Sequence, residues 1–170
     1  MADAPAKPVI NLADVALREQ AHGEKFKAQL GSFGRQIGSP SLGANLHVVE
    51  PGKRAYPFHN HHGIAELFII LEGEGTYRFG KERYPVKAGD VCAAPSGGPE
   101  TAHQIINTGT TPLRYLGISA VENGNSSQVV EYPDSGKFGV TSRFDWATGK
   151  GGIRFLGRAD TSLDYWEGEE

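Results

Sequence analysis

The chain has 170 residues, of which 17 are Lys or Arg and 20 are Asp or Glu, so its formal net charge is −3. This length favours one domain, and the slightly acidic balance provides no broad basic field for nucleic acid or an anionic membrane surface. We therefore expect neither as a partner. The 23 glycines and 10 prolines predict many short elements joined by tight turns and argue against a helical bundle.

Cys92 is the one cysteine of the sequence, which excludes an intrachain disulfide and a multi-cysteine zinc site. Such sparse cysteine usage fits a reducing compartment, and the first residues lack the basic flank and apolar run of a signal peptide. No stretch approaches the roughly 20 apolar residues that cross a bilayer. We expect a cytoplasmic protein, with Cys92 buried in a strand over residues 90–94.

The N-terminal residues 1–11 are predicted to form an arm, followed by one short helix. Apolar residues from Leu12 to Leu17 lie near helical spacing, and Gly23 provides a stop. From Leu42 the apolar pattern changes to period two, which is typical of a strand.

Seven further strands are predicted in quick succession, and glycine-containing turns separate nearly all of them. Their ranges are 66–71, 75–79, 82–86, 90–94, 103–107, 113–119 and 128–132. Many short strands with almost no helix indicate an all-β, antiparallel sandwich or barrel. Beyond Ser119 the sequence is more irregular, and we expect an extension that wraps over the surface, with Tyr165 and Trp166 as anchors.

Three histidines fall within four positions, at His59, His61 and His62. On a strand, side chains at i and i+2 share a face with Cα atoms about 6.6 Å apart, so the first two can point at one ion while His62 points away. Glu66 opens the apolar run LFIIL, where an unpaired buried carboxylate is costly and a metal would remove that cost. The plainer interpretation is a solvated strand end, with Glu66 in a salt bridge.

Residues 51–75, PGKRAYPFHNHHGIAELFIILEGEG, resemble the first motif of the cupins, G-x5-H-x-H-x(3 or 4)-E-x6-G. The matching residues are His59, His61, Glu66 and Gly73. One departure is that Gly52 lies six residues before His59 rather than five, which alters the turn and leaves the histidines and Glu66 in register.

Residues 89–107, GDVCAAPSGGPETAHQIIN, resemble the second cupin motif, G-x5-P-x-G-x2-H-x3-N. The matching residues are Gly89, Pro95, Gly97, His103 and Asn107. Five residues rather than two separate Gly97 from His103, so the loop before the histidine is longer than in the motif.

The resemblance implies an antiparallel jelly-roll barrel over residues 25–120, preceded by the arm and helix over 1–24 and followed by the extension over 121–170. It also implies one divalent transition metal, with zinc as the first expectation and Fe, Ni, Mn or Co as suitable alternatives. The implied metal ligands are His59, His61, Glu66 and His103. Small single-domain bacterial cupins, some described as candidate sugar-phosphate isomerases, share a Tyr-Pro-Asp segment like residues 132–134.

Three functions are consistent with such a site. A metal with open coordination positions could act as a Lewis acid in the isomerisation of a sugar, a sugar phosphate or a similar small metabolite. The same ligands would also suit an Fe(II) dioxygenase. The third alternative is a non-enzymatic protein that binds a small ligand, in which a filled tetrahedral zinc site is structural.

No catalytic residue is assigned from the sequence. Candidate cavity residues are His47, Tyr77, Arg78 and Gln104, although each has a plainer interpretation: a half-buried histidine for His47 and exposed strand positions for the others. Phosphate recognition would need basic residues such as Lys53, Arg54 or Arg78 to converge at the cavity mouth. The sheet edges of a barrel and the arm at 1–11 favour a homodimer, and His62 is given no ligand role.

Overall fold

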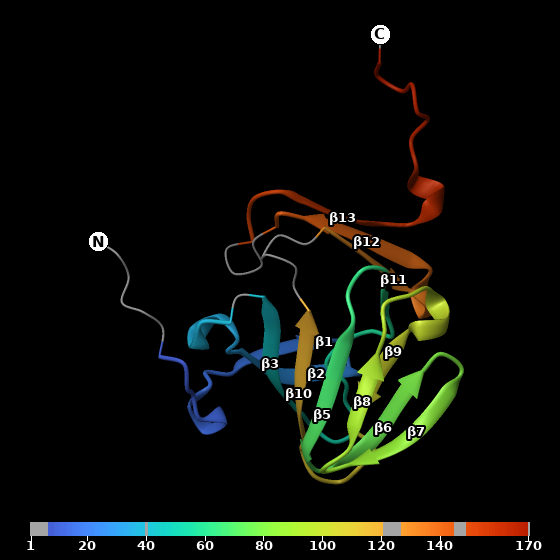
Figure 1. The fold of residues 1–170 in the computed structure, drawn as a ribbon. Helices are drawn as coiled ribbons and strands as arrows, with labels where there is room; N and C mark the ends of the chain where they lie inside the picture. Colours follow the sequence, from blue (N-terminus) through green and yellow to red (C-terminus); the bar gives the residue numbers. More distant parts are fainter. Residues whose placement is uncertain (1–6, 40, 121–126, 145–148, 170) are drawn as a thin grey trace.

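A computed structural model describes residues 7–39, 41–120, 127–144 and 149–169 (Figure 1). Strands dominate these residues, and every helix among them is a short 3-10 turn. The strands are β1 (Arg18–His22), β2 (Phe26–Ser32), β3 (Leu42–Val49), β4 (Asn60–His61), β5 (Glu66–Glu72), β6 (Glu74–Phe79), β7 (Glu82–Lys87), β8 (Val91–Ala94), β9 (His103–Ile106), β10 (Leu113–Ala120), β11 (Gln128–Tyr132), β12 (Lys137–Ser142) and β13 (Ile153–Gly157). The 3-10 turns are η1 (Leu12–Asp14), η2 (Arg35–Ile37), η3 (Pro99–Thr101), η5 (Pro133–Ser135) and η6 (Ala159–Thr161).

Three antiparallel sheets build the molecule. A six-stranded sheet in the order β1-β2-β3-β10-β5-β8 faces a three-stranded sheet in the order β7-β6-β9, and together they form the expected jelly-roll barrel. A four-stranded sheet in the order β13-β12-β11-β4 lies across one end of the barrel (Figure 1). We call the part of this sheet formed by β11, β12 and β13 the cap.

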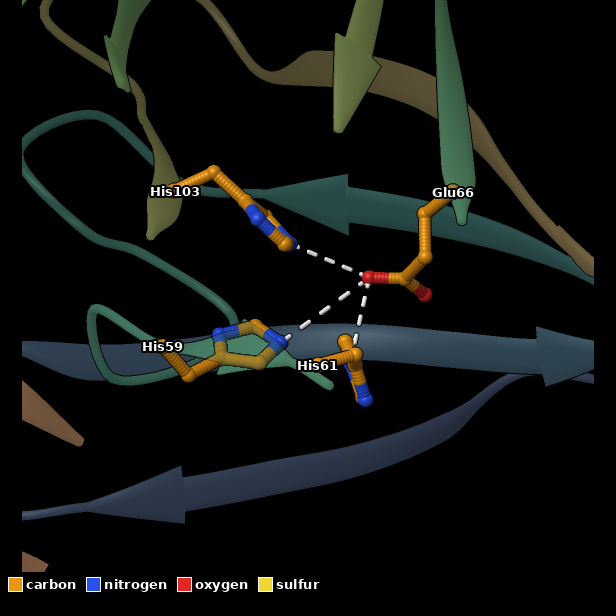
Figure 2. A group of neighbouring side chains, drawn as sticks. All are labelled: His59, His61, Glu66 and His103. Atoms are coloured by element: carbon orange, nitrogen blue, oxygen red, sulfur yellow. Dashed lines mark hydrogen bonds and ion pairs between the residues drawn. The ribbon is translucent and has the colours of Figure 1, made fainter. Parts of the chain in front are cut away.

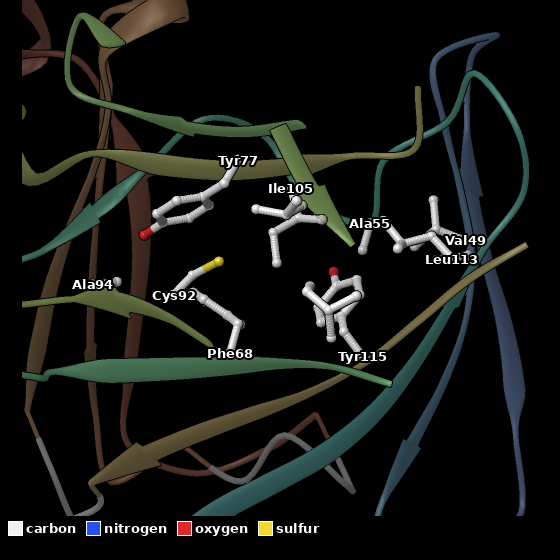
Figure 3. Close-up of a cluster of buried hydrophobic side chains, with 12 residues drawn as sticks. Val49, Ala55, Phe68, Tyr77, Cys92, Ala94, Ile105, Leu113 and Tyr115 are labelled. Atoms are coloured by element: carbon white, nitrogen blue, oxygen red, sulfur yellow. The ribbon is translucent and has the colours of Figure 1, made fainter. Parts of the chain in front are cut away.

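The core fills the space between the two barrel sheets (Figure 3). Phe68 of β5 lies opposite Cys92 of β8, and Tyr77 of β6 lies opposite Ile105 of β9. All four are at most 8% exposed, which confirms the prediction that Cys92 is a core residue. Burying such side chains stabilises the fold by about 1.5–3 kcal/mol each, so the core fixes the strands that carry the site.

Asn107 of the second motif and Gly73 of the first motif have structural roles at the end of the barrel away from the cap. Asn107 is fully buried, and its Nδ2 donates to the carbonyls of Val49 and Thr111, both at 2.8 Å. Gly73 turns between β5 and β6 with φ +81°, and a Cβ there would lie 2.6 Å from the carbonyl oxygen of Pro112. Neither residue is placed at the histidine cluster.

The strands predicted over residues 42–48, 66–119 and 128–132 are present, but the N-terminal helix expected from Leu12 to Glu19 is not. The structure has the single turn η1 followed by β1, a fully exposed strand that pairs with β2. Val15 is buried against Gly31, where a Cβ would approach Val15 Cγ1 to 2.5 Å. Val15, one of the apolar residues that suggested helical spacing, is thus used in tertiary packing instead, whereas Leu17 is 40% exposed.

Besides the pairing of β4 with β11, side-chain contacts of Arg78 and His62 join the cap to the barrel. The guanidinium of Arg78 on β6 binds both carboxylate oxygens of Asp134 in η5, at 2.6 and 2.8 Å, and lies 3.5 Å from the ring centre of Phe58. Farther along, His62 Nε2 lies 3.0 Å from the carboxylate of Glu131 on β11. The Tyr-Pro-Asp segment after the barrel therefore holds the base of the cap.

The C-terminal residues Tyr165 and Trp166 do not anchor the extension as expected. Tyr165 and Trp166 are 82% and 69% exposed, and their rings contact each other at 4.7 Å. After β13 the described chain has no strand to pair with and leads away from the barrel (Figure 1). The homodimer stays a prediction, and the first six residues of the arm predicted at 1–11 lie outside the described residues. No helix in the described part of the chain is long and apolar enough to span a membrane.

Candidate metal centre

Four side chains converge at the capped end of the barrel (Figure 2). His61 lies on β4, Glu66 is the first residue of β5, and His103 is the first residue of β9. His59 lies just before β4 and is paired with His103 through two backbone hydrogen bonds, of 3.2 and 2.7 Å. The structure therefore brings together all four residues proposed as ligands from the sequence.

The distances within this cluster suit a single ion. The Nε2 atoms of His103, His61 and His59 lie 3.0, 3.3 and 4.0 Å from Oε2 of Glu66, and the four candidate ligand atoms all lie within 4.8 Å of one another. Around an ion with bond lengths of about 2.1 Å, neighbouring ligand atoms are about 3.0–3.4 Å apart. The cluster needs little adjustment to enclose a metal.

Backbone carbonyls orient two of the imidazoles. Nδ1 of His59 lies 2.8 Å from the carbonyl oxygen of Pro57, and Nδ1 of His103 lies 3.2 Å from that of Thr101. Because a carbonyl oxygen can only accept, each Nδ1 carries a proton, which leaves each Nε2 as the atom that can bind a metal once it is deprotonated. Both Nε2 atoms face Glu66, so this donor set fits a divalent metal.

The longer loop before His103 has a structural explanation. Its extra residues form η3, whose last residue, Thr101, supplies the carbonyl beside His103 Nδ1. Gly97 at the start of the loop donates its N–H to the carbonyl of His61 at 2.9 Å. The insertion thus leaves His103 in register with the other three residues.

The protonation states of the cluster favour metal binding at neutral pH. Burial, reinforced by the neighbouring charges of His103 and His61, lowers the pKa of His59 to about 4. Burial alone would raise the pKa of Glu66, but hydrogen bonds and charge from His103 and His61 outweigh it and lower that pKa below its usual range. A neutral imidazole and an ionised carboxylate are the forms that bind metal.

The cluster opens into a cavity of about 290 Å³. Its floor is formed by barrel residues, including Asn45, His47, Tyr56, Phe68 and Gly117, together with His59, His61 and Glu66. Its roof is the cap, which contributes Gln128, Val130, Tyr132, Gly139, Thr141, Arg154, Phe155 and Leu156. The extension expected to be a surface wrap is therefore also one wall of the candidate site.

Of the four cavity residues suggested by the sequence, the structure places His47 in the lining. His47 is 3% exposed and stacks on Tyr115 at 4.5 Å, so it is more deeply buried than expected. Burial lowers the pKa of His47 to about 4. Its Nδ1 has no hydrogen-bond partner within the described part of the chain.

The other three candidates have structural contacts elsewhere. Tyr77 and Gln104 are buried, which corrects the expectation of exposed positions, because their polar atoms find backbone partners: the hydroxyl of Tyr77 donates to Ala93 O, and Nε2 of Gln104 donates to Tyr56 O. Arg78 holds Asp134. None of these three lines the cavity.

The basic residue of the cavity is one that the sequence reasoning did not identify. Lys53 donates to the carbonyl of Glu24 at 2.6 Å, and Arg54 lies 5.9 Å from the ring centre of Phe26, so neither reaches the lining. Arg154 of β13 lines the cavity instead. It follows the glycines at 151 and 152, and the alternation Ile153, Arg154, Phe155 is the signal that could have indicated a strand there.

The chain is similar to known proteins over defined parts of its sequence. Residues 45–119 match the family model described as "Cupin domain". Over 60 residues the chain is 43% identical to an oxalate-binding protein of Thermotoga maritima, an alignment that covers 35% of this chain and 47% of that protein, so the chain spans about half the length of this curated relative. Over 110 residues it is 31% identical to an uncharacterized protein of Methanocaldococcus jannaschii, covering 65% and 76% of the two chains.

Among solved structures, a candidate sugar phosphate isomerase from Acidithiobacillus ferrooxidans has a TM-score of 0.75 with this chain at 24% identity. The match covers 93% of this chain and 96% of that one. It therefore extends beyond residues 45–119 and includes the region of the cap.

Proposed function

Because the chain belongs to the cupin superfamily, we propose that it binds one divalent transition metal and acts on a small oxygenated metabolite. The metal ligands in this proposal are His59, His61, Glu66 and His103, and isomerisation of a sugar or sugar phosphate is the first reaction to test. The observation that carries the proposal is the convergence of these four side chains, three of which, His59, His61 and Glu66, line the floor of a capped cavity. The isomerase name of the Acidithiobacillus structure suggests the substrates to assay first.

A bound metal would supply Lewis-acid polarisation of a substrate carbonyl. The remaining chemistry belongs to two side chains of the floor. His47 is neutral near pH 7 because burial lowers its pKa to about 4, so a substrate would meet an uncharged imidazole in this part of the cavity lining. Burial raises the pKa of Tyr56 to about 12, which keeps its hydroxyl protonated and able to donate to a substrate oxygen.

The test combines metal analysis with a substrate panel. Protein purified from its native host should contain about one divalent metal per chain, and Glu66→Gln should lose most of it. Glu72→Gln is the matched control, because Glu72 lies at the other end of β5 and binds Arg114 at 2.6 Å. Fully metallated protein that converts no sugar or sugar phosphate would refute the isomerase. Oxygen consumption that needs anaerobic iron loading would instead identify an Fe(II) dioxygenase.

A second candidate function is binding of a small carboxylate without turnover. It is favoured by the 43% identity over 60 residues to an oxalate-binding protein. Titration calorimetry with oxalate, followed by recovery of the unchanged ligand, separates this function from the first. In that case Glu66→Gln should lower oxalate affinity together with metal content, while no substrate of the panel is converted.

A further inference from the structure

The cap presents a regular inner face to the cavity. Residues at alternate positions of its three strands line the cavity, as period two requires. They are Gln128, Val130 and Tyr132 on β11, Gly139 and Thr141 on β12, and Arg154 and Leu156 on β13. On β11 and β12 one face of the cap is therefore the roof, and on β13 Phe155, between Arg154 and Leu156, lines the cavity as well.

Strand register divides the roof into two rows. Gln128 pairs with Thr141, and Thr141 pairs with Arg154, so an amide, a hydroxyl and a guanidinium form one cross-strand row. Val130, Gly139 and Leu156 form the next row. A Cβ on Gly139 would lie 3.3 Å from Leu156 Cδ1, so the absence of a side chain there lets Leu156 pack over Gly139 within the apolar row.

We infer that the row formed by Gln128, Thr141 and Arg154 is a subsite for the anionic group of the ligand, a carboxylate or a phosphate. All three side chains can donate hydrogen bonds. Histidines aside, Arg154 is the one cationic side chain in the cavity lining that the structure describes. A guanidinium matches both anions through paired N–H donors, and it lies 5.7 Å from the ring centre of Phe144.

This inference rests on the proposed function and narrows its substrate class. Three of the proposed metal ligands, His59, His61 and Glu66, line the floor, and the polar row lines the roof of the same cavity. A ligand that uses both must carry an oxygen for the metal at one end and an anionic group at the other. The volume of about 290 Å³ lies at the lower end of the range for small-molecule sites, so we expect a small hydroxy acid, dicarboxylate or phosphate ester.

The experiment measures binding of oxalate and of inorganic phosphate to the full chain by titration calorimetry, with the metal content of every sample determined. Arg154→Ala should weaken binding by about tenfold to a hundredfold, the range for loss of a hydrogen bond to a charged group, and Arg154→Lys should recover part of it. Arg158→Ala is the matched control, because it removes the same charge from a residue that follows β13 and lies outside the cavity lining. It should bind within about twofold of the wild type. Metal content should be equal in all four proteins.

The preferred probe identifies the anion: tighter oxalate binding indicates a carboxylate ligand, and tighter phosphate binding a phosphate ester. Equal affinity of Arg154→Ala and the wild type, an equal loss in Arg158→Ala, or no binding of either anion to the wild type would overturn the subsite. Failure of the isomerase is distinguishable. Arg154-dependent anion binding without turnover of any sugar phosphate refutes the isomerase alone, whereas turnover that Arg154→Ala leaves unchanged, without anion binding, refutes the subsite alone.

Discussion

The contact between Arg78 and Asp134 should set the local stability of the cap. It joins β6 of the barrel to η5, which directly follows β11, through two hydrogen bonds of 2.6 and 2.8 Å. The Arg78 side chain is 22% exposed and that of Asp134 is 56% exposed. Since exposed ion pairs contribute about 0.2–1 kcal/mol and a bidentate geometry lies at the upper end, we expect Asp134→Ala to cost the cap about 1 kcal/mol.

Hydrogen exchange measures this quantity strand by strand. A loss of about 1 kcal/mol should speed exchange of the protected amides of β11 about fivefold, while the amides of β10 in the barrel should change little. The matched control is Glu72→Ala, which removes a partner at the same 2.6 Å distance from Arg114 but joins two barrel strands. It should leave exchange in β11 unchanged.

The same pair predicts a pH dependence. The neighbouring Arg78 lowers the pKa of Asp134, against a smaller opposing effect of burial. Because the folded-state pKa lies below the unfolded value of about 4, the stabilisation is present above that pH and is lost as pH falls through the folded-state pKa. Unchanged exchange of β11 in Asp134→Ala, or equal acceleration of β10 and β11, would refute the role given to this contact.

Two further predictions concern the site. Removal of metal by a chelator should lower the melting temperature by about 8 °C, because a ligand at 100 times its Kd contributes about 3 kcal/mol to stability. The control is Glu66→Gln, whose melting temperature should not change after the same treatment. His47 should account for about 3 kcal/mol of the stability that metal-free protein loses between pH 6.5 and 4, because, with its pKa lowered to about 4, it stays neutral while the unfolded chain takes up a proton. The free energy of unfolding, measured with urea, should depend less steeply on pH for His47→Phe than for the wild type. An equal pH dependence would contradict this.

The sequence allowed the barrel and the histidine cluster to be predicted because both depend on local spacing. The i, i+2 relation of His59 and His61 and the apolar run after Glu66 follow from strand geometry alone. The positions from β5 to β10 were likewise marked by turns, since each short strand ends at a glycine-rich or polar segment. These features need no knowledge of which strands become neighbours.

The cap was not predictable in the same way, since its role depends on pairing between strands distant in sequence. Arg154 becomes a cavity residue through the register of β13 with β12 and of β12 with β11. Arg78 gave no sign that it would bind Asp134, 56 residues away. The helix expected near Leu12 failed for a related reason, because packing of Val15 against Gly31 is set by the barrel and not by the local pattern.

One strand belongs to both halves of the cavity. β4 carries His61, and its residues pair directly with β11 of the cap, His61 with Val130 and Asn60 with Glu131. A ligand that orders the roof and a metal that orders His61 thus act on the same backbone. Thermodynamic linkage is reciprocal, so any factor by which the metal tightens ligand binding must equal the factor by which the ligand tightens metal binding. The coupling through β4 is measured by comparing metal affinity with and without the ligand.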